Sequence, residues 1–185
     1  DAGRTGGASQ SLERLHDDPS IVIDPDDGTI GVAWTDQAGR RAGCASCPHQ
    51  RRPDADVAFA NLPPGESAFS GSRRIDDTGD GLATEDRVGF SNQWRPAIAR
   101  GPRGGRLYAV WQDHRDGNND VWLAFSDDGG RHWSPNQRID DTGSGRSNQY
   151  APALTITADG TVTVVWQDDR DGEEHVYLAR GNLPD

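Results

Sequence analysis

The amino-acid sequence predicts an all-β protein built from propeller blades, and three observations support this prediction. Residues 56–79 align without a gap on residues 120–143, so the chain contains an internal repeat. Short alternating runs end in tryptophan three times, at Trp34, Trp111 and Trp166. The 185 residues include 23 glycines and 11 prolines, and only 32% are hydrophobic. Short strands between frequent turns, repeated at a period of roughly 40–60 residues, are typical of propeller blades.

Each repeat is expected to contain four antiparallel strands. "NQWRPAI" (92–98) matches "NQYAPAL" (148–154), and "DPSIVI" from Asp18 is a looser copy, so these segments predict the first strands. Glycine-containing turns such as "ADGT" lead into β-branched second strands such as "TVTVVW" (161–166). "DVWLAF" (120–125) and "HVYLAR" predict third strands, and the polar "HWSPNQRI" predicts a fourth strand at an outer edge.

One motif connects the repeat to a known family. Residues 126–133, "SDDGGRHW", fit the Asp-box pattern Ser-x-Asp-x-Gly-x-x-Trp, and with it the chain resembles the bacterial-neuraminidase-repeat, sialidase-like propellers. The resemblance implies a structural role for four residues: Ser126, Asp128, Gly130 and Trp133. Asp and Ser would cap the turn between the third and fourth strands, as these residue types commonly do, and the tryptophan would pack between blades.

The resemblance also implies six blades, and the chain holds about half of them. We place blade one at about residues 18–90, blade two at about 91–149 and blade three at about 150–185. Because "ERLHDDP" parallels "QRIDDTG", residues 1–17 are expected to complete blade three or to form the fourth strand of a preceding blade. Further blades of a longer chain would close the ring, or a second copy would do so as a symmetric dimer.

Loops between second and third strands are expected on the same face as the connections between blades, because antiparallel strands alternate in direction. The phrase "WQDxRDG" occurs twice on that face, and blade one keeps the aspartate but has Ala38 in place of the arginine. The repeated charges predict either ion pairs that hold the loops or a ring that binds sugars, acidic groups or calcium. The candidate residues are Asp36, Asp113, Arg115, Asp168 and Arg170.

Trp94 and Tyr150 occupy one repeat position just before the first strand of their blades. Aromatic side chains there would either stack on sugar rings or pack between blades. Both residues are therefore candidates for ligand binding.

The segment "CASCPH" raises the question of a disulfide or a metal site. Pro48 separates Cys47 from His49, which argues against a c-type haem, and zinc would need a fourth ligand. A local disulfide between Cys44 and Cys47 is expected, with free thiols or a metal as alternatives. Residues 76–81 leave an irregular calcium site open, and no other cofactor is expected.

Composition narrows the class of function. The net charge of −11 argues against a nucleic-acid partner, and no apolar run is long enough to span a bilayer. We expect a secreted, periplasmic or cell-surface module that binds carbohydrate or a protein without catalysis of its own. The alternatives are a glycoside hydrolase whose site is completed by further blades or a second copy, and a structural subunit. A hydrolase needs a catalytic carboxyl pair or its equivalent, and no such set is identifiable in the sequence.

Overall fold

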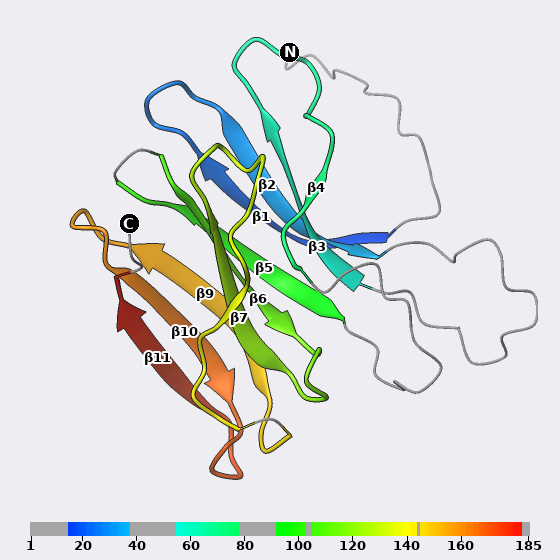
Figure 1. Ribbon diagram of the computed structural model, residues 1–185, viewed down its shortest axis with the longest axis vertical. Coiled ribbons are helices and arrows are strands. Elements are labelled where there is room, and N and C mark those ends of the chain that lie inside the picture. The colour runs from blue at the N-terminus through cyan, green and yellow to red at the C-terminus, as the bar shows by residue number, and fades with distance from the viewer. Residues whose placement is uncertain (1–14, 38–54, 78–91, 103–104, 144, 183–185) are drawn as a thin grey trace, which may run out of the picture.

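Three antiparallel sheets follow one another along an open arc (Figure 1). The computed structural model describes residues 15–37, 55–77, 92–102, 105–143 and 145–182, and every regular element within them is a strand. Among these residues there is no helix long and apolar enough to cross a membrane. The prediction of an all-β chain made of three propeller blades is confirmed.

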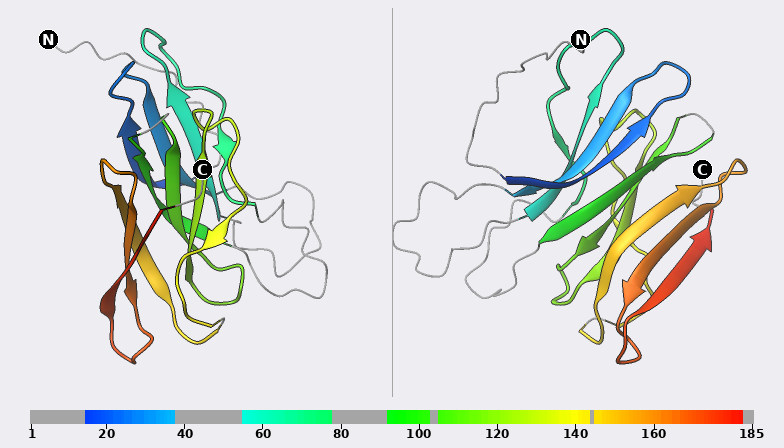
Figure 2. Two further views of the ribbon diagram at one scale, coloured as in Figure 1. Left: turned by 60° about the vertical axis from the view of Figure 1, so that its left-hand side comes forward. Right: turned by 180° about the vertical axis from the view of Figure 1, so that it is seen from behind.

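Each sheet is one blade, and its strands are ordered in space as they occur in the chain. Blade one contains β1 (Leu15–Ile23), β2 (Ile30–Gln37), β3 (Ala55–Leu62) and β4 (Arg73–Arg74). Blade two contains β5 (Gln93–Arg100), β6 (Leu107–Asp113), β7 (Asp120–Ser126) and β8 (Gln137–Arg138). Blade three contains β9 (Gln149–Ile156), β10 (Val162–Asp168) and β11 (His175–Gly181). The first strands β1, β5 and β9 lie side by side, as seen from behind in Figure 2.

Two apolar clusters join the blades, one at each junction. At the first junction, Ala33, Val57 and Phe59 of blade one pack with Ile98, Leu107, Ala109 and Trp111 of blade two. At the second junction, Val110, Val121 and Leu123 of blade two pack with Val162, Val164 and Trp166 of blade three. The core of the molecule therefore lies between the sheets, as expected where each repeat buries its faces against its neighbours.

The three tryptophans that end the second strands occupy equivalent positions. Trp34, Trp111 and Trp166 pair across the sheet with Ala58, Trp122 and Tyr177 of the third strands. Trp111 and Trp166 are buried, as the repeat predicts, whereas Trp34 is only half-buried. In the described part of the chain, no blade packs against the face of blade one on which Trp34 lies, which explains the difference.

A bulge recurs near the start of each first strand. The residue before the proline has a positive φ in all three blades, at Asp18 (50°), Arg95 (51°) and Ala151 (48°). This left-handed conformation costs a non-glycine residue roughly 1–2 kcal/mol, so its threefold occurrence marks it as a feature of the blade. β-Bulges re-aim side chains, and these three residues are exposed.

The register corrects the expected place of residues 15–17. His16 pairs with Asp36 of β2, as Gln93 and Gln149 pair with the equivalent aspartates of blades two and three. Residues 15–17 therefore belong to the first strand β1, and they do not form a fourth strand against β11. The segments "ERLHDDP" and "QRIDDTG" share the pair Asp-Asp, and this short match is why the sequence predicts a fourth strand there. The rest of that expectation, for residues 1–14, lies outside the described residues.

The fourth strands are shorter than expected. β4 and β8 contain two residues each, and blade three has three strands within the described residues. Polar side chains and Pro135 precede β8, and a residue without a backbone N–H does not extend a ladder. Beyond β8, the chain stays attached through the backbone bond from the Ile139 N–H to the Val121 carbonyl, 2.8 Å long.

The turn between β7 and β8 is held by its own side chains. The Ser126 hydroxyl donates to the Asp128 carboxylate at 2.9 Å and accepts from the Gly130 N–H at 2.9 Å. Asp128 also accepts from the backbone N–H groups of Arg131 and His132. The bonds from His132 lower the pKa of Asp128 well below its usual range. Trp133 then reaches Phe59 of blade one edge-on, with ring centroids 5.5 Å apart.

Gly130 gives a test of this junction. A Cβ atom at Gly130 would lie 2.1 Å from the Phe59 ring, and its φ is 84°, so Gly130→Ala should lower the free energy of unfolding by about 3 kcal/mol or more. Gly129 has a similar φ of 72° but open space around it, so Gly129→Ala should cost about 1 kcal/mol. Urea unfolding of both variants measures the difference, and equal losses would contradict the packing at this junction.

Candidate ligand-binding face

Within the described residues, one face of the arc carries the loops between second and third strands and the connection from blade two to blade three, and we call it the loop face. It comprises the starts of β1, β5 and β9 and the segments 114–119, 139–143, 145–148 and 169–174. The loops between β6 and β7 and between β10 and β11 lie at the bottom of Figure 1. The turns between first and second strands lie at the opposite end of the blades.

The repeated phrase forms the same hydrogen-bond pattern in blades two and three. In blade two, the buried Asp113 accepts from the Trp111 indole at 2.9 Å and from the Arg115 N–H at 2.9 Å. The Arg115 guanidinium donates to Asp113 at 2.7 Å and lies over the Trp122 ring, 3.9 Å from its centroid. These contacts close the loop around a buried carboxylate.

Blade three repeats the pattern with its own residues. Asp168 accepts from the Trp166 indole at 3.0 Å and from Arg170, which lies 4.0 Å over the Tyr177 ring. Burial raises the pKa of Asp168, but hydrogen bonds from Arg170 and Trp166 outweigh that effect, and the pKa lies below its usual value. Asp168 is therefore a charged partner of Arg170 at neutral pH.

The same arginines also join neighbouring blades. Arg115 donates to Asp77 of the preceding connection at 2.7 Å, and Arg170 donates to Asp141 at 2.6 Å. Asp77 and Asp141 occupy one repeat position, directly after the "RID" of each fourth strand. We call each such Asp–Arg–Asp chain a latch. The structure thus places Asp113, Arg115, Asp168 and Arg170 in contacts that hold loops and blades together.

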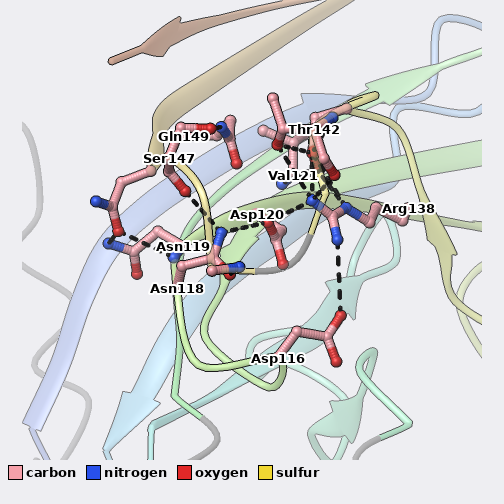
Figure 3. A network of polar contacts seen from close by, with 12 residues as sticks. Asp116, Asn118, Asn119, Asp120, Val121, Arg138, Thr142, Ser147 and Gln149 are labelled. Atoms are coloured by element: carbon pink, nitrogen blue, oxygen red, sulfur yellow. Dashed lines mark hydrogen bonds and ion pairs between the residues drawn. The ribbon is translucent and has the colours of Figure 1, made fainter. Parts of the chain in front are cut away.

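A second network lies behind the loop face in blade two (Figure 3). Asp120 is fully buried, and it accepts from the Asn118 amide at 2.7 Å and pairs with Arg138 at 2.7 Å. Arg138 also pairs with Asp140, whose carboxylate accepts from the Val121 N–H at 3.0 Å. Burial raises the pKa of Asp120 to about 6, with Asp140 adding to the effect and Arg138 opposing it.

Blade one repeats the core of this network. Arg74 pairs with Asp56 at 2.7 Å and with Asp76 at 2.6 Å, and Asp76 accepts from the Val57 N–H at 3.0 Å. An element present in consecutive blades serves the blade, so the shifted pKa of Asp120 reports a structural ion-pair network.

Between blades two and three the loop face is hollowed into a groove of about 460 Å³. Its lining combines amide, hydroxyl, carboxylate and guanidinium groups with glycines, from three loops: Gly117, Asn118, Gly145, Arg146, Ser147, Asn148, Asp169 and Gly172. None of these residues was singled out from the sequence.

Hydrogen bonds fix the walls of the groove. Asn118 donates to the Ser147 carbonyl at 2.7 Å and accepts from the Gly145 N–H at 2.6 Å, which ties the β6–β7 loop to the next connection. The Asn148 N–H donates to Asp169 at 2.6 Å, which ties that connection to the β10–β11 loop. The groove is therefore pre-formed by bonds between its own walls.

The aromatic candidates lie at the starts of the first strands. Trp94 and Tyr150 are half-buried and occupy equivalent positions, opposite Gln112 and Gln167. Trp94 lies beside His114, with ring centroids 6.5 Å apart. Blade one has Asp17 at this position, and its Asp36 lies 3.6 Å from the His16 ring nitrogen.

Two sequence expectations lie partly or wholly outside the described residues. Cys44, Cys47 and His49 fall in segment 38–54, and residues 78–81 of the calcium candidate are also outside. Within the described part of the chain, no group of three His, Cys, Asp or Glu side chains is placed to hold a metal ion.

The two partners of Arg115 differ in burial, which gives a test of the latch. Arg115→Ala removes a partner of the fully buried Asp113 and should lower the free energy of unfolding by about 3 kcal/mol. Asp77→Ala removes the half-exposed partner and should cost about 1 kcal/mol. Chemical unfolding at pH 7 compares the two. A larger loss in Asp77→Ala would show that the inter-blade bond matters more than the bond within the loop.

The raised pKa of Asp120 predicts a pH dependence. Because its pKa is about 6 in the folded chain and about 4 when unfolded, its protonation favours folding. This contribution is present below pH 4 and is lost as the pH rises through 6, by about 3 kcal/mol. Asp120→Asn should remove that part of the pH dependence between pH 4 and 6.5. Parallel stability curves for the variant and the unsubstituted chain would contradict the assignment.

Comparison with known proteins reports on the fold. No family model and no curated protein sequence matches the chain. Solved structures do match. A Hadza microbial sialidase has a TM-score of 0.62 at 17% identity over 90% of this chain and 35% of that one. A family 117 glycoside hydrolase from the marine bacterium Zobellia galactanivorans has a TM-score of 0.60 at 13% identity over 92% and 53%.

A third example is the α-L-arabinanase of Penicillium chrysogenum, with a TM-score of 0.59 at 14% identity over 92% of this chain and 50% of that one. The chain thus spans about a third to a half of the length of these structures. At such identities the likeness shows the fold alone, and that fold is part of a β-propeller.

Proposed function

We propose that the chain is part of a secreted, sialidase-like propeller that binds carbohydrate in the groove between blades two and three, without catalysis of its own. The groove carries this proposal. Its amide, hydroxyl and carboxylate groups suit a ligand with many hydroxyls, and it is large enough for a small saccharide. The similar structures support a carbohydrate ligand, since they include a sialidase, a glycoside hydrolase and an arabinanase.

Arg146 indicates which class of carbohydrate the groove would prefer. Arg115 and Arg170 of the loop face are paired with carboxylates, as is Arg138 behind it, and the exposed Arg95 lies on the bulge of β5, outside the groove lining. Arg146 lines the groove, is exposed and forms no ion pair within the described part of the chain. A guanidinium with open donors is suited to a carboxylate, so we propose that sugars carrying a carboxylate are preferred.

A glycoside hydrolase is the second candidate, and one observation favours it. Asp17 and Asp18 are exposed at the start of β1, and Asp18 has the left-handed backbone of the bulge. The bulge recurs in all three blades, but only blade one carries carboxyl groups there, since blades two and three have Trp94–Arg95 and Tyr150–Ala151. A hydrolase would still need a second catalytic group from further blades or from another copy.

The proposal predicts selective glycan binding. We expect the chain to bind carboxylated oligosaccharides, such as oligogalacturonates, more tightly than neutral oligogalactosides in isothermal titration calorimetry. Arg146→Ala should weaken binding of the acidic glycan by about tenfold, the effect of one charge-assisted hydrogen bond. It should leave the neutral glycan nearly unchanged.

Arg131→Ala is the matched control, because Arg131 is also exposed but lies on the opposite rim, in the turn between β7 and β8. Its binding should equal that of the unsubstituted chain. Release of new reducing ends from the bound glycan would favour the hydrolase. Absence of binding to either glycan would leave a structural or protein-binding role.

A further inference from the structure

Two faces at the ends of the arc expose side chains that the repeat otherwise buries. In the third strands, the valine of blades one and two is 0% exposed at Val57 and Val121, but its equivalent Val176 is 76% exposed. Phe59 and Leu123 are likewise 2% and 1% exposed, whereas the equivalent Leu178 is 57% exposed. At the other end, Ile21 is 63% exposed, while its equivalent Ile98 in blade two is 7% exposed.

The exposed face of blade three repeats a face that already covers a neighbour. Ala97, Val110, Val121 and Leu123 of blade two pack against blade three. The register places Ala153, Val165, Val176 and Leu178 at the equivalent positions of blade three, and all four residue types are identical. We call this set the covering face of blade three.

The exposed face of blade one matches the surface that such a covering face packs against. Blade three presents Leu154, Val164 and Trp166 to blade two. The equivalent residues of blade one are Ile21, Val32 and Trp34, which are apolar and only partly buried. We call this set the receiving face of blade one. Ile23, 57% exposed, extends it.

We propose that the covering face of blade three docks on the receiving face of blade one in a second copy of this chain. The contact would repeat the packing already seen at both junctions within one chain. Two copies related by a twofold axis then form two identical seams and a closed ring of six blades, within the usual range for propellers. Each seam would place the start of β9 of one copy beside the start of β1 of the other.

A second copy is favoured as the occupant because the chain itself carries both complementary faces. Exposed apolar side chains clustered on a sheet face mark an interaction site, and here the complementary surface is known in residue detail. The two exposed faces consist of residue types closely similar to those that already pack together between blades two and three. A second copy therefore supplies the apolar partner that each face needs.

The test is the mass of the purified 185-residue chain by sedimentation equilibrium. We expect twice the chain mass of 20.0 kDa. Leu178→Asp places a charge on the covering face, and Ile21→Asp places one on the receiving face. Each variant alone disrupts both seams, so its dimer should dissociate about 100-fold more readily, as for the loss of a central apolar contact. Both residues are exposed in the single chain, so circular dichroism should show an unchanged fold.

Mixing the two variants gives a sharper result. One seam of the mixed dimer then carries both substitutions, while the other seam carries neither, so the mixture should regain dimer mass. Phe69→Asp is the matched control: Phe69 is 50% exposed, belongs to the β3–β4 turn and lies on neither face, so this variant should remain dimeric.

A folded 20.0 kDa monomer would overturn the proposal, and the faces would then await further blades from another source. An open-ended series of masses would overturn the closed ring. A dimer that survives both substitutions would show that association uses a different surface, and a mixture that stays monomeric would overturn the pairing of the covering face with the receiving face.

Discussion

A blade has two apolar faces, and each is buried only where another blade lies against it. Blade two has neighbours on both sides, and all seven residues of its second strand β6 are buried. In the equivalent strand β10 of blade three, buried and partly exposed residues alternate, because only one face is covered. The burial of a residue in this chain therefore depends less on its type than on how many blades flank it. The same residue types, at Val121 and Val176 or at Leu123 and Leu178, change from buried to exposed for this reason alone.

At the loop face, the contacts between blades are made by charged side chains instead of apolar ones. These charged contacts explain why the phrase "WQDxRDG" is repeated. A buried carboxylate is costly unless it is paired and hydrogen-bonded, and Asp113, Asp120 and Asp168 each accept from an arginine and from a neutral donor. The arginines of the latches add stacking on Trp122 and Tyr177 and a second carboxylate from the preceding blade. The charged residues of "WQDxRDG" thus hold neighbouring blades together at the loop face, beyond the edge of the apolar clusters, where water would otherwise separate the blades.

The sequence was sufficient to predict the elements that repeat. Alternating runs, turn glycines and the three tryptophans determined the strands and their equivalence, because periodicity is a local property. Residues 15–17 were misplaced because a short Asp-Asp match occurs in two contexts, and only pairing with β2 distinguishes them. The groove could not be predicted, because its walls come from three loops of two blades that are distant in sequence. Repeat comparison also favours residues that recur, whereas Asn118 and Asn119 correspond to Glu173 and Glu174 in blade three.

On the loop face, residues that recur in the repeat determine the shape of the surface, whereas residues that do not recur determine its chemistry. The latches recur, and between blades two and three the β6–β7 loop lies beside the next connection, where the groove forms. The side chains at the rim do not recur: Asn118 can bridge to Ser147 and Gly145 because an amide both donates and accepts. A glutamate at that position could only accept at neutral pH and would face the Ser147 carbonyl without a donor. The amide-lined groove between blades two and three therefore depends on a residue that the repeat does not impose.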